Sequence, residues 1–269
     1  MPVLVVPLGL LVGLTLGALG GGGSILTVPA LVYVLGQDPR TATASSLLIV
    51  GISSVFALVP HARAGRVRLG QGLVFGVLGT AGSLAGTALG AFVAPQVLLT
   101  SFAGLMLVVA TLMLRRALRR GPEGGPDDRS SEPILTLRPL ACACPRLAKV
   151  VVTATVVGLI TGFFGVGGGF VLVPALVLAL AFPMPVAVGT SLLVMAVNSA
   201  TALAARTSSG ETHLNWPVIA TLTAAAIGGS LLGGRIARRV EPRRLAMTFG
   251  VLLVAVALYT AARSIPALF

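Results

Sequence analysis

Two short glycine runs are the residues of this sequence whose type and spacing could do chemistry. The first run covers residues 20–23 and is followed by Ser24, and the second covers residues 165–169 with one valine inside it. A helix that breaks at such a run exposes free N–H groups and the positive end of its dipole, and an anion suits those groups. The substrate-binding residues expected here are Gly21, Gly22, Gly23, Ser24, Gly167, Gly168 and Gly169.

Hydroxyl side chains form a second candidate group, at the start of an apolar segment in each half of the chain. Ser45 and Ser46 occur in one copy, and Thr190 and Ser191 occur at the matching place in the other. Hydroxyls at a helix start can cap free N–H groups, or they can line a substrate path beside the glycine runs. Both readings stay open, and all four residues are kept as candidates for substrate binding.

Polar side chains also lie deeper in the same two segments. Asn198 and Ser199 occur in the second copy, opposite Ser53 and Ser54 in the first. Polar groups at such depth are costly unless they are paired, so they either hold helices together or line a pathway. Asn198 is kept as a substrate-binding candidate on this basis.

Residues that catalysis or metal binding requires form no recognisable set. All seven acidic residues lie in loops or at segment ends, which favours an anion or a neutral solute over a cation as the substrate. Cys142 and Cys144 have no neighbouring His and make a poor zinc site. We therefore expect no enzyme activity, no cofactor and no metal. His61 and His213 lie near loops, where we expect solvated side chains; the alternative is a proton-linked group.

The elements that position these residues are apolar helices. Hydrophobic residues make up 56 % of the 269 residues and charged residues only 10 %, against about 25 % charged in a typical soluble domain. The stretches that contain no Lys, Arg, Asp or Glu are 1–37, 41–62, 69–114, 150–205, 212–234 and 245–262. Because a spanning helix needs about 20 apolar residues, the chain is predicted to be an all-α, multi-pass membrane protein that has the lipid bilayer as a partner.

The net charge of +12 could indicate a nucleic-acid partner, but the placement of the basic residues argues against one. They cluster between apolar runs, as the positive-inside rule expects. We therefore expect no nucleic-acid partner, and we expect the protein in the cell inner (plasma) membrane. The sequence leaves the oligomeric state open.

The chain contains an internal repeat. Residues 13–31 read GLTLGALGGGGSILTVPAL and residues 158–176 read GLITGFFGVGGGFVLVPAL. A shift of 145 aligns these stretches, and a shift of 147 aligns Gly82-Ser83-Leu84 with Gly229-Ser230-Leu231. We predict a first transmembrane repeat at 1–114, a cytoplasmic linker at 115–149 and a second transmembrane repeat at 150–269.

Each half holds about five hydrophobic segments. They are 3–19, 25–36, 41–60, 69–92 and 97–114, followed by 150–164, 170–181, 186–205, 216–236 and 245–262. The second segment of each half is too short to cross the hydrocarbon core at 1.5 Å per residue. The first two segments of each half are therefore predicted to form a Gly-linked broken or re-entrant helix pair.

Loop charges predict that the two repeats are inverted. Loop 61–68 carries three Arg residues, whereas the matching loop 206–213 carries one. Loop 93–96 has no charge, whereas the matching loop 237–244 carries four Arg residues. Equivalent loops then lie on opposite sides of the membrane, with both termini outside the cytoplasm. Five crossings per half give this result, and so do three if the Gly-linked pair enters and leaves on one side.

The twin motifs GGGGSILTVPAL and GVGGGFVLVPAL, each followed by a Ser/Thr-Ser-Leu-Leu element, resemble the TauE/SafE sulfite exporter family of membrane permeases. The resemblance covers nearly the whole chain outside the linker. It implies a permease for sulfite or a related organosulfur anion. An inverted repeat with broken helices is also typical of a secondary transporter that works by alternating access at a site between the repeats. The alternatives are a passive anion channel and a non-transporting membrane scaffold.

Overall fold

A computed structural model describes residues 2–37, 39–90, 92–93, 95–119, 144–164, 169–207 and 215–264. These residues form ten α-helices and one π-helical turn, with no strand among them, which confirms the predicted all-α class. The elements are α1 Pro2–Leu19, α2 Gly22–Pro29, η1 Ala30–Val34, α3 Pro39–Arg63, α4 Leu69–Gly90, α5 Pro95–Arg119, α6 Cys144–Phe164, α7 Gly169–Leu178, α8 Met184–Thr207, α9 Trp216–Arg239 and α10 Pro242–Ser264.

Six of these helices are long and apolar enough to cross a membrane, namely α3, α4, α5, α8, α9 and α10. Helices α1, α2, α6 and α7 provide only shorter apolar stretches. The five predicted segments of each half therefore correspond to three long helices preceded by a pair of shorter ones. Helix α5 continues to Arg119 and α6 begins at Cys144, so helical structure extends into both ends of the predicted linker.

The chain breaks between α1 and α2 at Gly20 and Gly21. Gly20 has a φ of +74°, a left-handed conformation that a residue with a Cβ adopts only under strain. Its N–H still donates to the carbonyl of Leu16 at 2.8 Å. The corresponding glycines before α7, including the predicted site residues Gly167 and Gly168, lie outside the described residues.

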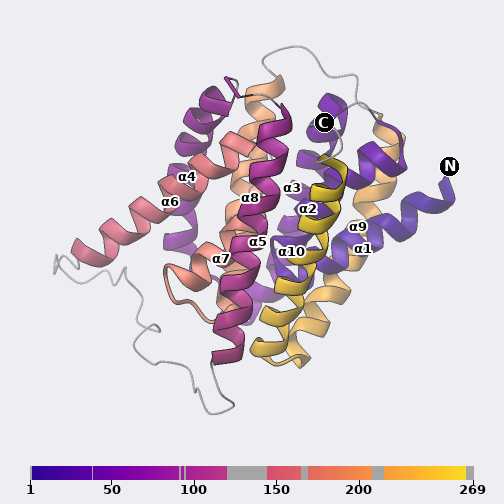
Figure 1. Cartoon of the computed structure of the whole chain (residues 1–269). Helices are drawn as coiled ribbons and strands as arrows, with labels where there is room; N and C mark the ends of the chain where they lie inside the picture. Colours follow the sequence, from indigo (N-terminus) through magenta and orange to yellow (C-terminus); the bar gives the residue numbers. More distant parts are fainter. Residues whose placement is uncertain are drawn as a thin grey trace.

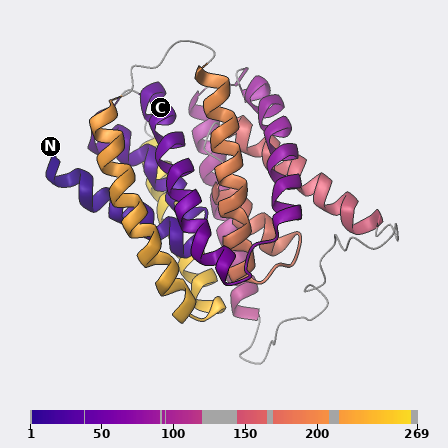
Figure 2. The same ribbon diagram turned by 180° about the vertical axis from the view of Figure 1, so that it is seen from behind.

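The first helix of each half packs against the other half. Helix α1 packs along α9, and α6 packs along α4, so the first helix of each half lies against the fourth helix of the other. Both views show α1 and α6 on opposite flanks of the bundle, inclined to the long helices (Figure 1, Figure 2). The bundle is thus assembled from both halves together rather than from two separate units.

Small residues make these two interfaces tight, and they do so at equivalent positions. Gly17 of α1 faces the backbone of Ser230 so closely that an added Cβ would overlap it. Gly162 of α6 faces the backbone of Ser83 in the same way. Because the 145-residue and 147-residue shifts map one contact onto the other, the helix packing follows the repeat. Small residues at membrane helix interfaces allow such close backbone approach.

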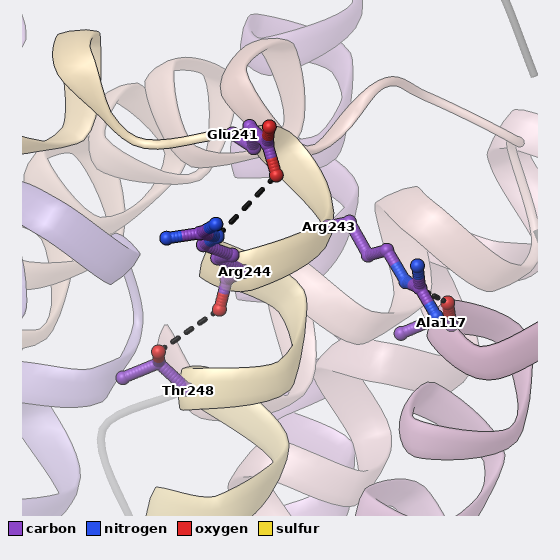
Figure 3. A network of polar contacts seen from close by, with 5 residues as sticks. All are labelled: Ala117, Glu241, Arg243, Arg244 and Thr248. Atoms are coloured by element: carbon purple, nitrogen blue, oxygen red, sulfur yellow. Dashed lines mark hydrogen bonds and ion pairs between the residues drawn. The ribbon is translucent and has the colours of Figure 1, made fainter. Parts of the chain in front are cut away.

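Equivalent long helices run in opposite directions. The loop that follows α3 lies beside the start of α8, where the backbone N–H of Arg68 donates to Thr190 Oγ1 at 3.2 Å. The start of α10 lies beside the end of α5, where Nε–H of Arg243 donates to the carbonyl of Ala117 at 3.0 Å (Figure 3). Antiparallel pairing of equivalent helices is what an inverted repeat predicts. The sidedness of the loops in a membrane stays a prediction.

The helix ends that carry most of the Arg residues gather on one face of the bundle, whereas Arg40, Arg206 and Arg263 lie at the opposite ends of their helices. Helix α9 passes to α10 beside the end of α5 at the bottom of Figure 1. The same corner holds the exposed ion pair between Arg244 and Glu241, with Nε and Oε2 3.4 Å apart (Figure 3). The end of α3 lies on this face too, because His61 contacts α9 at Gly234. This grouping is the one that the positive-inside rule expects of a cytoplasmic face.

Apolar side chains divide between the centre and the outer surface. Helix α7 is buried along almost its whole length, and Phe170 packs edge-on against Phe102 of α5 with ring centroids 5.0 Å apart. Outward positions of the long helices are apolar as well, including Val77 and Val251, which are 66 % and 59 % exposed. Exposed apolar side chains in this number indicate a surface that contacts lipid.

Candidate functional site

The first turns of the two short helices meet at the centre of the bundle. Gly21, which precedes α2, lies against the backbone of Gly169 and Phe170 at the start of α7, and an added Cβ would overlap the carbonyl of Gly169. The predicted site residues Gly21 and Gly169 are therefore brought together from opposite halves. The two backbone segments reach this separation only because Gly21 carries no side chain.

Ser24 faces the same contact. Its counterpart under the 145-residue shift is Gly169 itself, and a Cβ built on Gly169 would lie 2.7 Å from Ser24 Oγ. The Ser24 hydroxyl donates to the carbonyl of Gly21 at 2.8 Å and is buried. It thus holds the turn that leads into α2, in addition to standing beside the start of α7.

The remaining glycines of the first run point elsewhere. A Cβ on Gly22 would first meet the end of the Leu252 side chain on α10 at 3.1 Å, whereas a Cβ on Gly23 would lie 2.6 Å from the carbonyl of Val12. Gly22 thus faces α10, and Gly23 packs against α1. Of the three predicted glycines in this run, Gly21 alone contacts the start of α7 in the described structure.

The predicted hydroxyl residues do not cap helix starts. Helices α3 and α8 begin at Pro39 and Met184, so these residues lie in the second turn. Ser46 Oγ donates to the carbonyl of Thr43 and Ser191 Oγ donates to the carbonyl of Val188, both at 2.8 Å. The capping interpretation is wrong because each helix starts before its hydroxyl pair.

The same four residues are nevertheless buried. Ser191 lies next to the break, since its Oγ is 2.5 Å from a Cβ built on Gly20. Thr190 accepts the backbone N–H of Arg68. Ser45 is fully buried, and its hydroxyl has no hydrogen-bond partner. A buried hydroxyl without a partner is costly, which leaves Ser45 able to bind a polar group.

Asn198 lies away from the glycine contact, between α8 and α4. Its Oδ1 accepts a hydrogen bond from Thr80 Oγ1 at 3.3 Å, and the same hydroxyl is 3.3 Å from Thr201 Oγ1. These contacts join two helices, which is the first of its two predicted roles. Ser53 and Ser54, the counterparts on α3, are buried with no partner for either hydroxyl.

The electrostatics of the centre favour negative charge. Gly21 at the N-cap of α2 offers no side chain to the free N–H groups of the first turn. Neither α2 nor α7 carries an acidic residue in its first turn. Two helix starts that face each other add their positive dipole ends at one place, and such ends attract anions.

His61 corrects another expectation, because its side chain is only 3 % exposed. Nε2 lies 3.2 Å from the carbonyl oxygen of Gly17 in the last turn of α1, and Nδ1 is buried without a partner. The prediction of a solvated side chain is wrong for His61, since the end of α3 is covered by α1 and α9. His213 lies outside the described residues.

Acidic and thiol groups do not assemble a second kind of site in the part of the chain that the structure describes. No three His, Cys, Asp or Glu side chains gather there as a metal site. Glu241 is exposed between α9 and α10. Asp38, Glu211 and Cys142 lie outside the described ranges.

Comparisons with known proteins agree with this architecture. The model of the family "Sulfite exporter TauE/SafE" matches residues 5–260. A "Probable membrane transporter protein" of Xylella fastidiosa is 35 % identical over 257 residues, which cover 94 % of this chain and 92 % of the relative. "Probable membrane transporter protein YunE" of Bacillus subtilis is 30 % identical over 272 residues, which cover 94 % of each. No solved structure matches significantly. With ten helices in its described part and a family match over nearly its full length, the chain belongs to the TauE/SafE family of sulfite-exporter-type membrane transporters.

Proposed function

We propose that the protein is a secondary transporter of a small anion, sulfite or a related organosulfur anion, in the cell inner membrane. The observation that carries this proposal is the contact between the starts of α2 and α7, where Gly21 lies against Gly169. The amides of the first turn of α2, which no side chain caps, and the positive dipole ends of the two helices suit a small oxyanion. The printed name of the family supplies sulfite as the first substrate to test.

The mechanism that fits this contact is alternating access. The two short helices come from different halves and touch through backbone atoms. A rocking motion of one half against the other would separate them and open the contact to one side of the membrane at a time. Ser24 and Ser191 are the hydroxyls beside the break, and Ser45 is buried with no hydrogen-bond partner, so these three would accompany the anion as the contact opens. Of the other candidates, Thr190 bonds to the backbone of Arg68, Asn198 joins α8 to α4, and Ser46 bonds within α3.

Flux into liposomes tests the proposal. We expect purified protein to give saturable sulfite uptake that speeds up when the opposite side is preloaded with sulfite. Linear, unselective leakage would instead indicate the passive channel, and no flux of any small anion would indicate the scaffold. Liposomes with a heat-unfolded sample serve as the control for leakage through the lipid itself.

A further inference from the structure

In the last turn of the first helix of each half, one backbone carbonyl is contacted by a side chain from another helix. The two side chains are of different chemical types. The carbonyl oxygen of Gly17 in α1 lies 3.2 Å from Nε2 of His61 on α3. The carbonyl oxygen of Gly162, the equivalent residue in α6, lies 3.3 Å from Thr87 Oγ1 on α4, whose hydroxyl also donates to the carbonyl of Ser83 in its own helix at 2.8 Å. One end is thus held by an imidazole, which titrates near neutral pH, and the other by a hydroxyl, which does not.

The two halves differ at one equivalent position, where one carries a threonine and the other a glycine. Thr87 corresponds to Gly234 of α9 under the 147-residue shift. A Cβ built on Gly234 would lie 3.8 Å from His61 Nε2 and 3.9 Å from the carbonyl oxygen of Gly17. A threonine side chain at position 234 could therefore reach the carbonyl of Gly17. Because position 234 is a glycine, the imidazole of His61 has room to lie there instead.

Geometry fixes the protonation state of His61 in this conformation. A carbonyl oxygen can only accept, so Nε2 carries the hydrogen. Nδ1 is buried with no partner, and a proton there would be a buried charged donor with no acceptor, which is costly. The bond to the C-terminal end of α1 favours positive charge, whereas a neutral ring still donates from Nε2 and leaves no charged donor buried at Nδ1. The imidazole that holds α1 is therefore neutral.

Two arginines lie on the elements around the imidazole. The backbone N–H of Arg66, in the loop after α3, donates to the carbonyl of His61 at 3.0 Å, and Arg238 lies one turn beyond Gly234 on α9. Helix α1 contributes no titratable side chain. A protonated His61 would thus meet two positive charges and, among these groups, no carboxylate.

We propose that His61 is a proton-binding site that controls the first break: the neutral imidazole holds the end of α1, and a proton taken from solution onto Nδ1 releases it. Gly17 is three residues before Gly20, so release frees the backbone that leads into α2. Thr87 has no such response, and only one of the two breaks becomes proton-sensitive. The link from release to transport rests on the proposed function.

A substrate-free experiment tests the proton site itself. Ser191→Cys reports on the first break because its Oγ faces Gly20, and Ser46→Cys, the equivalent residue, serves as the matched control. Both are placed in a chain with Cys142 and Cys144 replaced by Ala. We expect the alkylation rate at position 191, divided by that at position 46, to rise by up to about tenfold per pH unit as pH falls, since release binds one proton.

Two further variants assign the effect to His61. His61→Gln keeps an N–H donor without a titrating ring, and the double variant His61→Ala with Gly234→Thr transfers the hydroxyl of the other half. Both are expected to give a ratio that does not change with pH, whereas Thr87→Val keeps the pH dependence. A pH-independent ratio in the parent, or the parental pH dependence in the double variant, overturns the proposal.

Sulfite flux separates this proposal from the proposed function. We expect the double variant to transport with a flatter pH profile than the parent, and His61→Ala alone to transport poorly until Gly234→Thr restores the bond. Absence of sulfite flux in the parent at every pH contradicts the proposed function, while the alkylation ratio still decides the proton site. Flux in the double variant with the parental pH profile contradicts control by His61.

Discussion

The helix pairs α1–α9 and α4–α6 are built alike along their length and differently at one end. Gly17 and Gly162 each lie against backbone of the partner helix at equivalent places. Their carbonyls, however, are held by His61 in one pair and by Thr87 in the other. Backbone packing leaves little freedom for change, because an added atom overlaps the partner helix. A side chain that reaches a carbonyl from a neighbouring helix can change, and the two halves differ there.

The broadest test of this comparison is the orientation of the two halves, where the expected difference is all or none. Cysteine at Ala64, in the loop after α3, should be labelled only from the cytoplasmic side. Cysteine at Asn215, before α9, should be labelled only from the outside. Both positions are exposed, and membrane-impermeant reagents applied to each side give the measurement. Labelling of both from one side would remove the inverted repeat.

The next largest effect is expected where the two halves are alike. Gly17→Ala and Gly162→Ala each place a Cβ against partner backbone, and overpacking costs about 1–3 kcal/mol. We expect both to lower the thermal unfolding midpoint strongly and by similar amounts. Gly104→Ala, whose Cβ meets nothing within 4 Å, is the control. A large effect in only one of the two would break the equivalence of the pairs.

A smaller and more local effect is expected at the centre. Gly21→Ala places a Cβ against the carbonyl of Gly169, whereas Gly22→Ala meets the flexible end of Leu252 at 3.1 Å and the side chain of Leu19 at an ordinary contact distance of 3.5 Å. We expect the first to reduce sulfite flux by more than about tenfold, since each 1.4 kcal/mol of added barrier is a factor of ten, and the second to transport nearly normally. Unfolding midpoints of both variants separate lost transport from lost folding. Equal flux in the two would show that the start of α7 is not part of the route.

The smallest effect is expected at the hydroxyl that holds Gly162. Thr87→Val removes the contact to Gly162 together with the intrahelical hydrogen bond to Ser83, and a hydrogen bond contributes about 0.5–1.5 kcal/mol to stability. The unfolding midpoint should fall slightly and equally at all pH values. Thr221→Val is the matched control, because that hydroxyl donates to Pro217 within its own helix. A loss that depends on pH would contradict the assignment of proton sensitivity to the other half.

The sequence predicted the elements well because their signals are local. Charge-free stretches located the helices, and the glycine runs located the break at Gly20. The shift of 145 even predicted which residues are equivalent. Local signals fail for the direction in which a residue points. Gly21 and Gly22 are neighbours in one run, yet one faces α7 and the other α10, because helical phase and the position of α10 decide it.

Contacts between distant parts of the chain were the other source of error. His61 near a loop is typical of a solvated side chain, but α9 and α1 cover it. That cover depends on Gly234, far along the chain, which leaves room for the ring. The burial of Ser45 without a partner likewise depends on packing from other helices. The repeat alignment offered one signal that could have found the difference, namely a glycine at 234 where the first half has Thr87.

The exchange of helices between halves also sets a condition on biosynthesis. Helix α1 leaves the ribosome first, whereas α9, the helix along which it packs, is made almost at the end of translation. Helix α4 is likewise made before its partner α6, but only α5 and the linker are translated between them. The first half must therefore remain in the bilayer or at the insertion machinery with small-residue surfaces uncovered until its partner helices arrive. A chain stopped before α9 would leave α1 without its partner, so the native packing of α1 can form only after α9 has been made.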